Sequence, residues 1–186
     1  MKLQNILILL VVLFIIGGGY YFFNIPKPPE TPEPQIFVWQ VEMEDIQHIE
    51  IRLPRENMSQ AFIKIEEPDK FPWYFDDPQR SAIDKERWGG GIPLLLSGPG
   101  AVRVIAENAT PEQLAEFGLL NPRMEITLTL KNGHIMKNMI GDRTPNGAAD
   151  YVQAPSTNDV ALVDYTWYDI LERLVKEPPY APPPAK

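Results

Sequence analysis

The sequence predicts an α+β fold: a mostly antiparallel sheet with two or three helices on one side, preceded by one transmembrane helix. An uncharged apolar run occupies residues 6–23, period-two runs broken by turns fill much of residues 36–163, and helical spacing is confined to short segments. A chain of 186 residues suits one domain with appendages. We divide it into a transmembrane anchor (1–25), a proline-rich linker (26–35), an extracytoplasmic domain (36–177) and a proline-rich tail (178–186).

The apolar run reads ILILLVVLFIIGGGYYFF, and a helix over it would be about 27 Å long, close to the hydrocarbon thickness of a bilayer. Its apolar character on every face argues against a core helix. A cleaved signal peptide is the alternative, but the aromatic exit suits a membrane interface better than a cleavage site. The residues assigned to the anchor are Ile6, Leu10, Phe14, Tyr20, Tyr21, Phe22 and Phe23.

The charges that flank the run predict its orientation. Lys2 and the terminal amine precede it, whereas Lys27, Glu30 and Glu33 follow it. Positive charge favours the cytoplasmic side, so we expect a single-pass protein of the cell membrane with a cytoplasmic N-terminus and a periplasmic or extracellular domain. The linker PKPPETPEP favours an extended polyproline rod of about 28 Å, which would hold the domain away from the bilayer.

The first half of the domain reads as strands followed by an interrupted helix. QIFVWQVEM predicts a first strand, and the alternating runs IQHIEIRL and AFIKIE, separated by a turn, predict a hairpin. In AIDKERWGGGIPLLLSG the apolar spacing is helical, but three glycines and Pro93 oppose a continuous helix. We therefore expect a broken or tightly packed helix in this segment.

The second half contains the clearest local signals. Thr110, Pro111 and Gln113 form the pattern of a capping box, and Gly118 is expected to end that helix. MEITLTLKNGHIMKNMI predicts a hairpin with Asn132-Gly133 in a type I′ turn. Two short strands should follow near residues 151–153 and 159–163. A last helix should run from an Asp164 cap to the prolines at 178, after which the tail is either free or bound along a partner.

Five segments of the chain occur in a distinctive order: DIQHIEIRL, PWYF, AIDKERWGGGIPLLLSGPGAVRVI, AEFGLLNPRMEITLTLKNGHIMKNMIGD and YVQA. In this order the chain resembles one repeat of the bacterial membrane-anchored domain-of-unknown-function family found near gliding-motility-type ABC transporter components. The resemblance covers residues 45–163 and rests on FGLLNP at Phe117–Pro122 and on Ile140-Gly141. Larger members carry several copies. The family implies an envelope location and a fold, with no catalytic residues.

Composition excludes several classes of function. The chain has no cysteine, which rules out disulfides, thiolate metal sites and cysteine nucleophiles. Its formal net charge of −8 argues against a nucleic-acid partner, because that affinity comes from Lys and Arg on phosphates. We find no metal-binding pattern around His48 or His134, no serine elbow and no phosphate-binding loop, and we therefore predict no cofactor, no metal and no enzyme activity.

Two groups of residues are the remaining candidates for function. The acids that flank the aromatic run 71–75 could supply the paired carboxyls of an envelope hydrolase; they are Glu66, Glu67, Asp69, Asp76 and Asp77. Asp76 and Asp77 with Pro78 also form an ordinary turn pattern. A partner could approach a flat patch at Trp88, and core packing of this tryptophan is the alternative. The full set of possible partner contacts is Trp88, Gly89, Gly90, Gly91, Trp73 and Tyr74.

The leading hypothesis is a non-enzymatic accessory or scaffold subunit of a larger membrane-protein complex, which could serve transport, respiration or photosynthesis. The expected partners are the lipid bilayer and the other subunits of that complex. The alternatives are an extracytoplasmic ligand-binding module that uses Trp73 and Tyr74, and an envelope hydrolase.

Overall fold

The computed structural model describes residues 11–20, 35–68, 71–89 and 91–182. The chain divides into two units, Met1–Pro34 and Gln35–Lys186, and the second is the domain.

In the first unit, residues 11–20 form a helix in which Phe14 and Tyr20 are exposed. Within the described residues, no helix combines the length and the apolar composition needed to cross a membrane. The predicted anchor also includes residues on both sides of 11–20, and its other assigned residues, Ile6, Leu10, Tyr21, Phe22 and Phe23, lie outside the described part of the chain.

The domain is built on one sheet, which contains nine strands within the described residues. Its order is β1-β5-β9-β8-β7-β6-β2-β3-β4, and every neighbouring pair is antiparallel, which confirms the predicted class. The strands are β1 (Ile36–Phe37), β2 (Ile46–Leu53), β3 (Met58–Lys64), β4 (Trp73–Phe75), β5 (Gly100–Ala106), β6 (Met124–Leu130), β7 (Ile135–Arg143), β8 (Ala149–Gln153) and β9 (Val160–Asp164).

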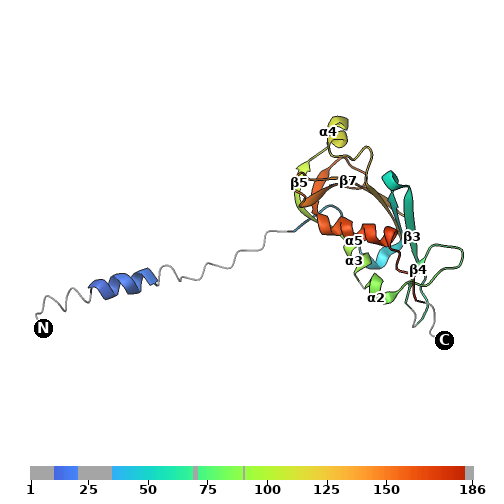
Figure 1. Cartoon of the computed structure of the whole chain (residues 1–186), viewed down its shortest axis with the longest axis horizontal. Coiled ribbons are helices and arrows are strands. Elements are labelled where there is room, and N and C mark those ends of the chain that lie inside the picture. The colour runs from blue at the N-terminus through green and yellow to red at the C-terminus, as the bar shows by residue number, and fades with distance from the viewer. Residues whose placement is uncertain (1–10, 21–34, 69–70, 90, 183–186) are drawn as a thin grey trace, which may run out of the picture. The chain divides into compact units, whose positions relative to one another are not determined.

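Helices lie on both faces of this sheet. Those of the domain are α2 (Lys85–Trp88), α3 (Ile92–Ser97), α4 (Pro111–Glu116) and α5 (Tyr165–Lys176), with short 3₁₀ turns at Met43–Asp45 and Pro54–Glu56. Figure 1 shows the sheet curving around α5, which contacts β2, β3, β8 and β9.

The position of α4 differs from the expectation that the helices share one side. Leu114 of α4 packs with Val160 in a small second cluster, whereas Val163 of the same strand packs in the main core with α5. Side chains an odd number of positions apart in a strand point to opposite faces. The segment around α4 therefore covers the outer face of the sheet, opposite α5.

Local signals of helix ends are confirmed. The Thr110 side chain accepts a hydrogen bond from the backbone of Gln113, whose own side chain completes the capping box. Gly118, at a φ of 72°, follows this helix. Asp164 caps α5 by accepting a hydrogen bond from the Thr166 backbone N–H. The segment 82–98 is broken as expected, into α2 and α3.

The hairpin of β6 and β7 is confirmed, but its turn is not of type I′. That turn requires a positive φ at both central residues. Gly133 has a φ of 82°, whereas Asn132 is not among the residues with positive φ. The Gly133 N–H donates to the carbonyl of Leu130, and the His134 N–H donates to the Asn132 side chain. The connection is thus a tight turn closed by one left-handed glycine.

The first strand is much shorter than predicted. Only Ile36 and Phe37 pair with β5, and the chain beyond them follows the loop after α3 instead. The Val41 N–H donates to the carbonyl of Ser97, and the indole N–H of Trp39 donates to the carbonyl of Leu96. The tertiary contacts of Trp39 thus override the strand pattern.

The described part of the tail packs on its own domain. The ring of Tyr180 stacks on Phe75 at a centroid distance of 4.1 Å, and the residue also forms a bridge with Ile83. The Ala181 N–H donates to the carbonyl of Ala82 at 3.0 Å. The tail thereby covers the segment beside β4, the strand at one end of the sheet.

A buried amide in β7 gives a first testable expectation. Asn138 is completely buried, and neither side-chain polar atom has a hydrogen-bond partner within the described structure. Leucine has the same number and branching of side-chain heavy atoms and removes this desolvation penalty, so we expect Asn138→Leu to raise the free energy of unfolding by about 1–2 kcal/mol. Urea denaturation measures this change. A destabilised Asn138→Leu variant would show that the amide has a partner in solution.

Candidate functional site

The tryptophans selected from the sequence are core residues. Trp88 and Trp73 are only 2% and 5% exposed, and their ring centroids are 5.5 Å apart. Trp88 also lies 4.7 Å from the ring of Phe62. Trp88 therefore packs in the core, as the alternative to a partner-binding patch predicted. A Trp73–Tyr74 platform for a ligand has the same difficulty, since only Tyr74 is partly exposed.

The glycines of the same candidate patch offer little more surface. Gly89 and Gly91 are half-buried, and Gly90 lies outside the described residues. Gly89 has a φ of 59° and closes α2, so its conformational freedom is used in the break between the two helices. This role is sufficient to explain a glycine at that position.

Asp76 and Asp77 lie in a turn that links β4 to the next segment. Arg80 and His48 both form hydrogen bonds with the Asp76 carboxylate, and the Asp77 carboxylate accepts one from the Ser81 N–H. The Arg80 hydrogen bond lowers the pKa of Asp76, and hydrogen bonds from Ser81 lower that of Asp77. A glycosidase proton donor needs a raised pKa. The hydrogen bonds therefore favour the ionised form of both carboxyls, which suits a structural role in the turn and not the proton donor of an acid–base pair.

This turn predicts a definite pH response. Because the pKa of Asp76 in the folded state lies below its ordinary value of 3.8, the unfolded chain binds the proton first as the pH falls. The contribution of Asp76 to stability is therefore complete above that value and is lost as the pH falls through the folded pKa. We expect the Asp76 carboxyl, followed by NMR, to titrate below pH 3.8 and to move up in Arg80→Asn, since asparagine tolerates the positive φ at position 80.

Asp77 is the internal control for this titration. Its pKa is lowered mainly by hydrogen bonds from Ser81, and the Arg80 side chain takes no part in it. Its pKa should stay low in Arg80→Asn. An unchanged Asp76 titration in that variant would contradict the assignment.

A network of charges joins β7, β8 and α5. Asp150 is 1% exposed and accepts hydrogen bonds from the guanidinium groups of Arg123 and Arg143. The Arg143 guanidinium also donates to Asp169 at 2.6 Å, and that of Arg123 lies 4.0 Å above the ring of Tyr168. Each cation has a partner within the domain. We therefore interpret the network as a structural clamp, that is, a set of ion pairs that holds β7, β8 and α5 together.

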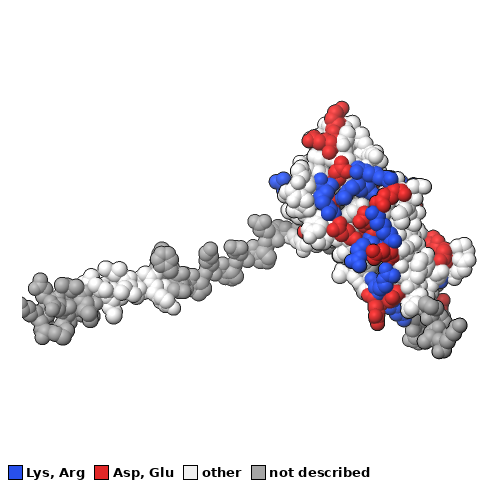
Figure 2. Space-filling view, viewed as in Figure 1, with Lys and Arg blue, Asp and Glu red and all other residues white. Residues whose placement is uncertain are grey.

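Charges of both signs share one face of the domain. Figure 2 shows Lys and Arg interleaved with Asp and Glu in a band across that face. The Nζ of Lys176 in α5 lies 2.9 Å from carboxylate oxygens of both Glu56 and Glu172. A face on which opposite charges alternate presents no extended field of one sign. It is a weak candidate for binding a polyanion.

The edge of the sheet at β1 and β5 is different in character. Because β1 pairs only with Gly100 and Ala101, the rest of β5 has no strand beside it on this edge within the described residues. Large apolar side chains are exposed here, Val102 at 65% and Leu94 of the neighbouring α3 at 62%. We call this region the edge surface, and its exposed apolar residues are Ile36, Phe37, Leu94, Val102 and Val104.

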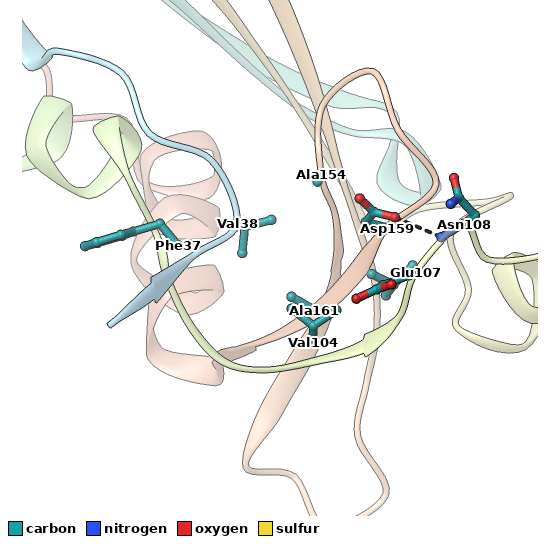
Figure 3. Close-up of a pocket in the computed structure, with 9 residues that line it drawn as sticks. Phe37, Val38, Val104, Glu107, Asn108, Ala154, Asp159 and Ala161 are labelled. Atoms are coloured by element: carbon teal, nitrogen blue, oxygen red, sulfur yellow. Dashed lines mark hydrogen bonds between the residues drawn. The ribbon is translucent and has the colours of Figure 1, made fainter. Parts of the chain in front are cut away.

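Two cavities adjoin at the edge surface and share Phe37 in their linings. The larger, of about 670 Å³, lies between β1 and the α3 loop and includes Leu94 and Trp167. The smaller, of about 290 Å³, lies where β5, β8 and β9 meet. Figure 3 shows that in the smaller cavity Val38 faces Glu107 and Asp159 across the space, whereas the ring of Phe37 points away.

A bulge in β5 shapes the smaller cavity. Val104 pairs with Ala161 and Ala106 with Val160, so one extra residue of β5 stands between two consecutive pairs. In a regular strand Val104 and Glu107 would lie on opposite faces. The extra residue reverses the alternation, as bulges do beside functional sites, and both residues line the cavity.

The polar groups of the smaller cavity are mostly acidic. Its lining within the described residues contains Glu107, Asn108 and Asp159, and no Lys or Arg. Asp159 is fixed in place because its Oδ1 accepts a hydrogen bond from the Asn108 N–H at 2.8 Å. Sequence reasoning missed this cavity, because its walls come from three distant segments. Within the described residues, no group of three or more His, Asp or Glu side chains could hold a metal ion.

Comparisons with protein-family models, with curated proteins and with solved structures found no match to this chain.

Proposed function

We propose that this protein is a non-enzymatic accessory or scaffold subunit of a larger membrane-protein complex, and that it contacts its partner through the edge surface. In this proposal, residues 6–23 anchor the chain in the cell membrane with the N-terminus in the cytoplasm. The proline-rich linker carries the domain into the periplasm or the extracellular space. The resemblance to the bacterial membrane-anchored family favours the same location.

The edge surface is the observation that carries this proposal. Exposed apolar side chains are common singly, but several that surround two adjoining cavities are typical of an interaction site. Two of them, Ile36 and Phe37, form the first strand of the domain, directly after the linker in sequence. Burying Val102 and Leu94 against a partner would supply favourable apolar area of about 25 cal/mol per Å².

The test uses the full chain extracted from its native membranes in mild detergent. We expect the wild type to migrate in size-exclusion chromatography as part of a complex larger than its own 21.2 kDa plus the micelle. The double variant Leu94→Glu/Val102→Glu should shift to the free position, since it places two charges in a desolvated contact. Leu120→Glu is the matched control, because Leu120 is 63% exposed, lines neither cavity, and precedes Asn121, whose carbonyl accepts a hydrogen bond from Arg55.

Two outcomes would overturn the proposal. One is a wild-type chain that is monomeric in every detergent tested, and the other is an equal loss of the complex in Leu120→Glu. The anchor is tested separately by a carbonate wash of membranes. Release of the chain, or a mature N-terminus beyond Asn24, would remove the membrane part of the proposal.

A further inference from the structure

We infer that the smaller cavity at the edge surface binds the side chain of a Lys or Arg from the partner protein. This inference rests on the proposed function, because it names the chemistry by which the partner is recognised.

The two sides of the cavity complement the two parts of such a side chain. Val38, Ala154 and Ala161 give an apolar wall, and Glu107 and Asp159 stand opposite Val38. A lysine or arginine has a long aliphatic stem and a cationic head, so the stem can lie on the apolar wall while the head contacts the carboxylates. An anion or a purely apolar group would match only one part of this lining.

The size of the cavity agrees with a single side chain. Its volume of about 290 Å³ is at the lower limit of pockets that hold small-molecule ligands. The Asp159 carboxylate is already oriented by the Asn108 N–H, and the bulge in β5 brings Glu107 to the same space. The Asp159 carboxylate is thus positioned before a ligand arrives, which reduces the ordering that binding requires.

The position of the cavity connects it with the rest of the edge surface. Val104 and Phe37 belong both to its lining and to the exposed apolar residues around it. A partner segment that covers these apolar side chains would therefore reach the cavity. The net charge of −8 also favours encounter with a basic partner over an acidic one.

The experiment uses the full chain in detergent micelles and follows the backbone amides by NMR. The probe is Nα-acetyl-lysine methylamide, and the comparison probe is its Nε-acetylated form, which has the same stem without the charge. We expect saturable shifts at Asn108, Ala154 and Ala161 with the charged probe, with a dissociation constant in the millimolar range. The neutral probe should bind about tenfold more weakly.

Matched variants test the carboxylates. Glu107→Gln/Asp159→Asn keeps the shape of both side chains and the acceptor for Asn108, and it should weaken the charged probe about tenfold. Glu86→Gln, at an exposed position on α2, removes one of the same charges elsewhere and should change nothing. If the double variant does not fold, the comparison of the two probes on the wild type still tests whether the cavity prefers a cation.

Equal binding of the two probes, shifts confined to other residues, or no saturable shift would each overturn the inference. The chain's own Lys27 and Lys186, in the two proline-rich segments, are among the lysines outside the described residues and are tested as alternative occupants. If Lys27→Gln or Lys186→Gln strengthened probe binding about tenfold, the cavity would belong to the chain itself rather than to a partner.

Failure of this inference is distinguishable from failure of the proposed function. A complex that survives detergent although neither probe binds would reject only the cationic side chain. Specific probe binding by a chain that is always monomeric would reject the scaffold proposal and leave a cation-binding cavity.

Discussion

Asp150→Ala is expected to lower the free energy of unfolding by about 3–5 kcal/mol, which is a large part of the stability of a domain of this size. The carboxylate is buried beneath α5 and holds two guanidinium groups, with a distance of 3.1 Å to the Nε of Arg143. Its removal leaves Arg123 and Arg143 partly buried without the anion between them. An unpaired charge in that environment is far less stable than a paired one.

The pKa shifts of the network have the same cause. Burial raises the pKa of Asp150, while the hydrogen bond from Arg143 and the charge of Arg123 oppose the increase. Hydrogen bonds to Asp150 and Asp169 raise the pKa of Arg143. The carboxylate thus depends on both cations for its charge, and the cations depend on it, so the three side chains act as one unit.

Chemical denaturation of the variant measures this effect, and two further variants interpret it. Asp169→Ala removes only an exposed contact of Arg143, so its cost should stay below about 1 kcal/mol. The triple variant Arg123→Met/Arg143→Met/Asp150→Leu replaces the buried carboxylate and its two cations with apolar side chains and should recover most of the loss. Equal costs for Asp150→Ala and Asp169→Ala would contradict the clamp.

Signals within one element predicted the structure well. The capping box at Thr110, the Asp164 cap and the alternation of β6 and β7 depend on residues a few positions apart, and each was found. The break between α2 and α3 also followed from local glycines. In such segments, backbone propensity and tertiary packing favour the same conformation.

Features that depend on distant contacts were not predictable in the same way. β5 was not expected as a strand, because two bulges break its alternation and its partner β9 lies far along the chain. The side of the sheet that α4 covers depends on which face of β9 it meets. The smaller cavity at the edge surface combines residues near positions 37, 105 and 159. Only the strand order β1-β5-β9-β8 brings them together.

Gly141→Ala is the second substitution with a large expected effect, a loss of about 3 kcal/mol or more. A methyl group at this position of β7 would overlap the carbonyl oxygen of Phe117 and would lie 3.1 Å from the Cγ of Leu119. Because the clash is with a backbone atom, no change of side-chain rotamer can relieve it. The loop after α4 must move away from the sheet.

That movement would break contacts that fix the loop. The Phe117 carbonyl accepts a hydrogen bond from the Asp142 N–H at 2.8 Å, and the Gly141 carbonyl accepts one from Arg123 at 2.9 Å. This is where the two sequence motifs FGLLNP and Ile140-Gly141 meet. Gly141 is explained by the close approach of the two backbones, and Gly118 by its φ of 72° and by the Asp142 side chain, which a Cβ there would overlap. Neither explanation requires a ligand.

Thermal and urea unfolding of Gly141→Ala measure the loss, with Gly91→Ala as the matched control. A Cβ at Gly91 meets nothing within 4 Å, and its φ of −93° is open to any residue, so that variant should change stability by less than about 0.5 kcal/mol. Gly141→Ala should also expose the Leu119 cluster to solvent, which hydrogen exchange at Asp142 and Leu119 would detect. Wild-type protection at those amides would show that the loop does not pack on β7 in solution, and the structural reading of both motifs would then be wrong.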